Sequence, residues 1–279
     1  MKNLFTVLFF AFSLLSFTQE IQFEKTLNEA FAKAKQQNKS VFIEYYSPSC
    51  PICKKVAVVL KDAKVVEYYN KNFVNYALNI DNGMTKEEEN FMKASGLHLD
   101  GVPVFLFFDA NTNYLHHSSV KADTNTIMEI GRISLQPNLR NAALAEKYQK
   151  GDRTIKTLYA YANLLLTKHD FEKQEEVADA LYDVFPKADL STQKSYIILK
   201  NVVNAIENGF FLHWVNNISK LNGLEQGAKA GSEKAILERI LLKELSNPER
   251  KYWPKEKKEA VKKMIIDLGL TNNPEIYFE

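Results

Sequence analysis

The first half of the chain alternates between two hydrophobic patterns. Short runs rich in β-branched and aromatic residues predict strands, and these runs are residues 40–46, 73–80, 104–108 and 114–120. Longer runs with apolar residues at helical spacing predict helices, and these cover residues 23–37, 54–70, 85–95 and 124–135. The predicted order is a helix followed by β, α, β, α, β, β and α, which is typical of an α/β domain.

The pattern changes after Gln136-Pro137-Asn138, because no strand-like run follows. Helices are predicted over residues 139–149, 153–167, 171–185, 191–208, 211–221, 232–245 and 255–268. Helix pairs recur at about 34 residues, the period of tetratricopeptide repeats, and residues 158–186 loosely fit that pattern. An irregular helical bundle is the alternative. We therefore expect two domains, an α/β domain of residues 19–135 and an all-α domain of residues 136–279.

Composition narrows the class of protein. Hydrophobic residues make up 46% of the 279 residues, enough for a sizeable core in each domain. The 36 Lys and Arg residues nearly balance the 34 Asp and Glu residues, so nothing indicates a nucleic-acid partner. Two cysteines are too few for a scaffold held together by several disulfides.

The N-terminus has the pattern of a secretion signal. Lys2 supplies a positive charge, and residues 4–17 form an apolar run that is shorter than the ~20 residues of a membrane span. Ser16-Phe17-Thr18 offers small residues for cleavage before Gln19. We expect residues 1–18 to be a signal peptide and the mature protein to be exported, to the periplasm, with no transmembrane segment after cleavage. An uncleaved membrane anchor is the alternative.

The two cysteines, Cys50 and Cys53, are spaced C-x-x-C between a predicted strand and a predicted helix. A sulfur that caps the helix faces unpaired N–H groups and the positive end of the dipole, which favour the thiolate of Cys50. Pro51 suits the first helical position. Cys53 lies one turn further on and can resolve a mixed disulfide. No second ligand pair indicates zinc or another metal, and a merely structural disulfide is the alternative.

Two further features flank this motif. Glu44 lies in the middle of the apolar strand before the cysteines, where burial would raise the pKa of its carboxyl group. Gly101-Val102-Pro103 precedes the very apolar residues 104–108. A proline at that place opens a strand, which a sheet tolerates.

On these residues, the chain from about Gln22 to Leu135 resembles the thioredoxin superfamily. The resemblance implies a thioredoxin-like fold with parallel strands in the centre of the sheet and a final antiparallel hairpin. It implies that Cys50 attacks a disulfide, that Cys53 resolves, and that Glu44 assists proton transfer from Cys53. It also implies that Pro103 is cis and lies against the active site. Val102, with Pro51 and Ile52, would then contact the substrate.

The chain departs from the common family pattern at several places. Ser49 stands where the family usually has Trp, Glu44 where it usually has Asp, and Pro51-Ile52 where it usually has Gly-Pro. The dipeptide between the cysteines helps to set the redox potential. Reductase, oxidase and isomerase activity therefore all stay open.

These features together predict an exported thiol–disulfide oxidoreductase. It would need no cofactor, would act on protein disulfides or dithiols, and would exchange electrons with a redox partner protein. The competing hypothesis is a binding module in which the cysteine pair is not catalytic and the helical domain recruits a partner.

Overall fold

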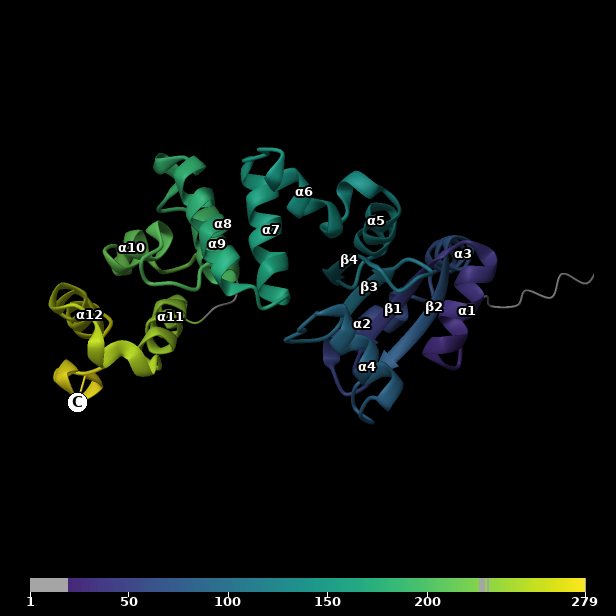
Figure 1. Cartoon of the computed structure of the whole chain (residues 1–279), viewed down its shortest axis with the longest axis horizontal. Helices are drawn as coiled ribbons and strands as arrows, with labels where there is room; N and C mark the ends of the chain where they lie inside the picture. The colour runs from purple at the N-terminus through teal and green to yellow at the C-terminus, as the bar shows by residue number, and fades with distance from the viewer. Residues whose placement is uncertain (1–19, 226–228, 230, 279) are drawn as a thin grey trace, which may run out of the picture. The chain divides into compact units, whose positions relative to one another are not determined.

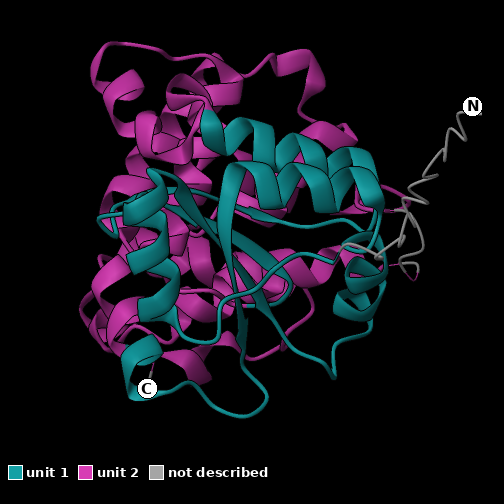
Figure 2. Ribbon diagram, turned by 90° about the vertical axis from the view of Figure 1, so that its right-hand side faces the viewer, with its two compact units in different colours: residues 1–89, 101–135 teal, residues 90–100, 136–279 magenta. Residues whose placement is uncertain are grey.

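The computed structural model describes residues 20–225, 229 and 231–278 (Figure 1). The expected signal peptide lies outside the described residues. The chain divides into two compact units, coloured separately in Figure 2. The first comprises residues up to Glu89 together with Gly101–Leu135, and the second comprises Asn90–Asp100 together with Gln136–Glu279.

The first unit is built on a four-stranded mixed sheet with the order β2-β1-β3-β4 (Figure 1). Its strands are β1 (Ser40–Tyr46), β2 (Phe73–Asn79), β3 (Val104–Phe108) and β4 (Tyr114–Ser119). Strand β1 is parallel to β2, and β3 is antiparallel to both β1 and β4. The final hairpin is confirmed. The expectation of central parallel strands is wrong, because the central pair β1–β3 is antiparallel and β2 lies at the end of this sheet.

Helices cover the sheet of the first unit. They are α1 (Leu27–Gln37), α2 (Pro51–Val59), α3 (Ala63–Asn72), α4 (Lys86–Ser95) and α5 (Thr124–Leu135). Two predicted helices differ from those observed. The first begins at Leu27 because Thr26 and Glu29 form a capping box, while Phe23 forms an isolated parallel bridge with Asn75. The helix predicted over residues 54–70 is two helices, because the Asp62 side chain caps a new one.

A buried aromatic cluster fills the space between one face of the sheet and helices α2, α3 and α5. Phe42 of β1 lies at its centre, with its ring 4.7 Å from the rings of both Tyr69 and Phe105. Tyr69 is fully buried and donates its hydroxyl hydrogen to the carbonyl of Ile127 at 2.8 Å. On the other face, the Phe31 ring of α1 packs edge-on to Phe108. The sheet is thus covered on both sides.

The second unit is largely helical (Figure 1). Its α-helices are α6 (Leu144–Gln149), α7 (Ile155–Thr167), α8 (Phe171–Val184), α9 (Gln193–Val202), α10 (Gly209–Val215), α11 (Ala235–Leu245) and α12 (Lys255–Asp267). Short 3-10 helices are η1 (Pro137–Leu139), η2 (Asn141–Ala143), η3 (Lys187–Asp189), η4 (Ile218–Lys220), η5 (Ser232–Lys234), η6 (Pro248–Tyr252) and η7 (Pro274–Tyr277). Helices α7 and α8 pack side by side. The tetratricopeptide character stays a prediction.

Residues 90–100 belong to the second compact unit, although the sequence analysis assigned them to the first domain. The backbone N–H of His98 donates to the carbonyl of Thr167 at 2.7 Å. The His98 ring stacks on that of His169, with 3.8 Å between ring centroids. These contacts hold the segment between α4 and β3 against the turn that joins α7 to α8.

In the part of the chain that the structure describes, no helix combines the length and the apolar character that crossing a membrane requires.

Replacing Phe42 by alanine should lower the free energy of unfolding by about 3–5 kcal/mol, because the buried ring leaves a cavity among its aromatic neighbours. Urea unfolding followed by circular dichroism measures the loss. Val58→Ala is the matched control: its side chain is 72% exposed, so the change should stay within about 0.5 kcal/mol. Equal losses in the two variants would contradict this account of the core.

Candidate active site

Cys50 stands at the junction of β1 and α2. It is the N-cap residue of α2, with extended backbone angles, and Pro51 occupies the first helical position. The backbone N–H of Cys53 donates to the Cys50 sulfur at 3.4 Å. The sulfur therefore takes the place that a serine or aspartate oxygen has in other helix caps. Both cysteines carry free thiols in this structure.

The two thiols differ in their affinity for protons. Hydrogen bonds from the backbone N–H and the side chain of Cys53 lower the pKa of Cys50 below its ordinary value. Burial raises the pKa of Cys53 to about 11, since only 3% of that residue is exposed. Cys50 is therefore the thiol that ionises more readily, and Cys53 stays protonated until a base removes its proton.

The loop before β3 lies against Cys50. The Cys50 S–H donates to the carbonyl of Val102 at 3.8 Å, and the Val102–Pro103 peptide bond is cis, as the resemblance implies. Pro103 is buried and Val102 half-buried. Pro51 and Ile52, which follow Cys50 in the chain, are exposed, Ile52 by 53%. Val102 thus contacts Cys50, Pro51 follows Cys50 in the chain, and Pro103 adjoins Val102.

Glu44 is a buried carboxyl group in the middle of the sheet. It pairs with Ala77 of β2 and Phe105 of β3 and is 5% exposed. Side chains two residues apart on a strand share a face, so Glu44 projects to the face of Phe42, which α2 covers. Burial raises the pKa of Glu44 to about 7, and a charged Glu44 in turn raises the pKa of Cys53. Desolvation at this position agrees with the sequence prediction.

Three polar residues beside Cys50 form hydrogen bonds that the sequence analysis did not predict. Asp81, which follows the predicted strand of residues 73–80, accepts a hydrogen bond from the backbone N–H of Ser49 at 3.0 Å. The hydroxyls of Ser47 and Ser49 lie 2.7 Å apart. One sequence signal could have found Asp81: it follows a strand parallel to β1, and the carboxyl ends of parallel strands meet at one edge of a sheet.

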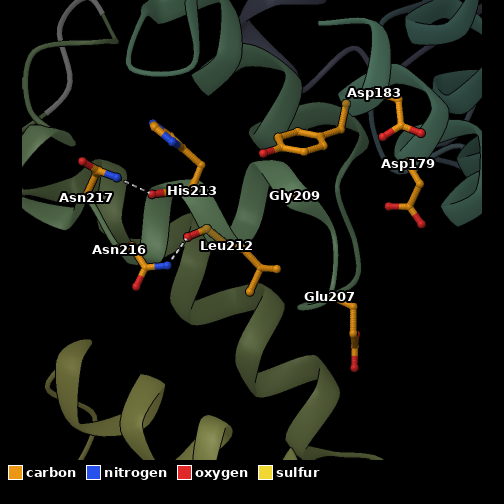
Figure 3. Close-up of a pocket in the computed structure, with 9 residues that line it drawn as sticks. Asp179, Asp183, Glu207, Gly209, Leu212, His213, Asn216 and Asn217 are labelled. Atoms are coloured by element: carbon orange, nitrogen blue, oxygen red, sulfur yellow. Dashed lines mark hydrogen bonds between the residues drawn. The ribbon is translucent and has the colours of Figure 1, made fainter. Parts of the chain in front are cut away.

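A cavity of about 590 Å³ lies within the helical unit, away from the cysteine motif in sequence (Figure 3). Its lining comes from α8, the residues before α10, and α10 with the turn after it: Asp179, Tyr182, Asp183, Glu207, Gly209, Leu212, His213, Asn216 and Asn217. The amides of Asn216 and Asn217 are already used, since they donate to carbonyls one turn back in α10. This cavity contains neither thiol and is no part of the candidate site.

The burial of Glu44 predicts a pH-dependent stability. The folded protein binds the Glu44 proton more tightly than the unfolded chain, whose carboxyl has its ordinary pKa of 4.5. The stabilisation is therefore complete below pH 4.5 and is lost as pH rises through about 7. Relative to wild type, Glu44→Gln should become more stable over this window, by up to roughly 3 kcal/mol at pH 8.

Urea midpoints of both proteins at pH 5, 6, 7 and 8 measure this difference. Glu67→Gln, at an exposed position of α3, is the control and should leave the midpoint unchanged at every pH. A Glu44→Gln difference that does not grow between pH 5 and 7 would show that Glu44 is not desolvated.

The first part of the chain is similar to known proteins. The family model described as thioredoxin-like matches residues 22–110. A putative disulphide-isomerase from Bacteroides thetaiotaomicron is 23% identical over 42% of this chain and 95% of its own (TM-score 0.36). A thioredoxin from Thermus thermophilus is 19% identical over 48% of this chain and 98% of its own (TM-score 0.34). A disulphide isomerase from Xylella fastidiosa Temecula1 is 13% identical over 42% of this chain and 98% of its own (TM-score 0.33).

A search of the curated proteins found no match. The family match spans β1, both cysteines, Glu44 and the Val102–Pro103 bond, and the helices that follow lie outside it. Residues 22–110 therefore form a thioredoxin-like domain, which a helical region follows.

Proposed function

We propose that this protein is a thiol–disulfide oxidoreductase that exchanges electrons between the Cys50–Cys53 pair and protein cysteines. The observation that carries the proposal is the cap of α2, where the Cys53 N–H donates to the Cys50 sulfur at 3.4 Å. Stabilised as a thiolate, Cys50 is the nucleophile. A purely structural role for the pair would not require that arrangement.

The first step joins enzyme and substrate. In the reductive direction, the Cys50 thiolate attacks one sulfur of a substrate disulfide. A new S–S bond forms between Cys50 and that sulfur, the substrate S–S bond breaks, and the second substrate sulfur leaves as a thiolate.

The second step releases the substrate. Cys53 loses its proton, and its thiolate attacks the Cys50 sulfur, forming the Cys50–Cys53 disulfide while the substrate sulfur leaves as a thiolate. Two electrons have passed from the pair to the substrate. Because the pKa of Cys53 is about 11, this step needs a base, and the pKa of Glu44, about 7, suits it to accept the proton.

Exposed groups around Cys50 fit an extended peptide. Val102 presents its backbone beside the sulfur, and Pro51 and Ile52 add an apolar rim. We therefore propose a protein disulfide or dithiol as the substrate, with Val102, Pro51 and Ile52 in contact with it. A second dithiol protein would return the pair to its starting state.

We also propose that the protein is exported to the periplasm, on the basis of the signal pattern in residues 2–18. Mass spectrometry of protein purified from the native cell would find a mature N-terminus at Gln19. An intact Met1 in the purified protein would contradict export by this route.

Single cysteine variants test the order of attack. With oxidised glutathione as probe, Cys53→Ser should accumulate a glutathione adduct on Cys50, because the resolving thiol is missing. Cys50→Ser should form essentially none, since Cys53 is buried and protonated. Mass spectrometry reads both results. Adducts of equal yield in the two variants would reverse or abolish the proposed roles.

The reduction potential of the pair tests the function as a whole. Because the lowered Cys50 pKa favours the reactive thiolate, the pair should equilibrate with glutathione and have a potential within the range of known dithiol oxidoreductases, about −270 to −120 mV. Equilibration against glutathione buffers, followed by alkylation of free thiols, measures it. A pair that never equilibrates would refute catalysis and favour the binding-module alternative.

A further inference from the structure

A carboxylate in the turn after the neighbouring strand β2 holds the loop that precedes Cys50. Strands β1 and β2 are parallel, and Tyr46 pairs with Asn79 at their carboxyl ends. The backbone N–H of Ile80 donates to the carbonyl of Tyr46 at 3.0 Å, which continues the pairing beyond the strands. Asp81 is therefore brought directly opposite the residues that precede Cys50.

The loop of residues Ser47–Ser49 is tied together from several sides. The Ser49 N–H donates to Asp81 Oδ2 at 3.0 Å and to the Ser47 hydroxyl oxygen at 3.2 Å. The two serine hydroxyls are 2.7 Å apart. The Cys50 N–H donates to the carbonyl of Ser47 at 3.2 Å. Ser47 is only 4% exposed, so the surrounding protein holds this residue of the network in place.

Asp81 itself is anchored as an anion. Its own N–H donates to the Asn79 side chain at 3.0 Å. Hydrogen bonds from Ser47 and Ser49 hold the pKa of Asp81 below its ordinary value, so the carboxylate is charged at neutral pH. These contacts extend from Asp81 through Ser49 and Ser47 to the backbone of Cys50. The side chain of Cys50 then caps α2.

We propose that Asp81 is a positioning residue for the redox site: it fixes the Ser47–Ser49 loop, and with it the Cys50 sulfur, through the hydrogen bond that it accepts from the Ser49 N–H. The negative charge of Asp81 acts on Cys50 in the opposite sense. This inference rests on the proposed function, because it concerns the reactivity of Cys50. The two effects of Asp81 have opposite signs. The hydrogen bond keeps the sulfur at the N–H groups of α2, and the charge opposes a second negative charge nearby.

The environment of the Cys50 thiol combines hydrogen bonds with one negative charge. The groups that act on this thiol include the N–H groups of Cys53 and Ile52, the Cys53 side chain and Asp81. Of these, Asp81 alone is a charged side chain, and it raises the Cys50 pKa against the effect of the hydrogen bonds. Glu44 acts on Cys53.

Two substitutions separate the two effects of Asp81. Asp81→Asn keeps an oxygen that accepts from the Ser49 N–H but removes the charge. The thiolate should then form at lower pH, and the rate of alkylation at pH 6 should rise roughly two- to threefold, because a larger fraction of Cys50 is ionised. Asp81→Ala removes both charge and acceptor, which frees the loop. The pH at the midpoint of its alkylation rate should be higher than in Asp81→Asn.

The experiment follows alkylation of Cys50 by iodoacetamide between pH 4.5 and 9 in the full chain, with the modified peptide identified by mass spectrometry. The reduction potential is measured in parallel and should become more oxidising in Asp81→Asn. Glu67→Gln, a charge change at an exposed site of α3, should match wild type in both measurements. Urea unfolding verifies that each variant is folded.

The outcomes distinguish this inference from the proposed function. A wild-type midpoint near the unperturbed ~8.5 would refute the proposed function itself. If the wild-type midpoint is lowered but neither Asp81 variant moves it, the role of Asp81 is refuted and the function stands. If the Asn and Ala variants shift equally, positioning by the hydrogen bond is refuted.

Discussion

The candidate active site depends on the unpaired backbone N–H groups at the start of helix α2. The first N–H groups of a helix have no partner within it, and at α2 the Cys50 sulfur accepts from one of them. A thiolate pairs with these N–H groups better than a thiol, because the helix dipole adds to the hydrogen bond. Pro51 at the first helical position removes an N–H that would otherwise stay unpaired. The reactivity of Cys50 is thus a property of the backbone around it.

Cys53 and Glu44 lie in a buried environment, whereas Cys50 lies at the N-terminus of a helix. Both lie where water is excluded, so their neutral forms are favoured and the pKa of each is raised. The aromatic cluster around Phe42 creates that dry face. A site with one ionisable thiol at the surface and one protonated thiol beneath it can carry out two successive exchanges in a fixed order.

The loop that borders Cys50 is also connected to the helical region through the chain. Residues 90–100 pack with the second unit, and Gly101-Val102-Pro103 follow at once in the first. The stacked rings of His98 and His169 and the His98 N–H bond to Thr167 hold this segment. Within the second unit, residues 90–100 are thus held by contacts with the turn that joins α7 to α8.

Local features of the sequence determined much of the fold. Residues 40–46, 104–108 and 124–135 form the predicted elements with the predicted limits, because hydrophobic period and turn residues act over a few positions. The cap at Cys50 was predictable for the same reason. Only tertiary structure decided the antiparallel centre of the sheet, the break after α2 and the meeting of Asp81 with Ser49. Asp81 and Ser49 are 32 positions apart. The hydrophobic pattern of a segment shows that it forms a strand but not which distant strand it pairs with.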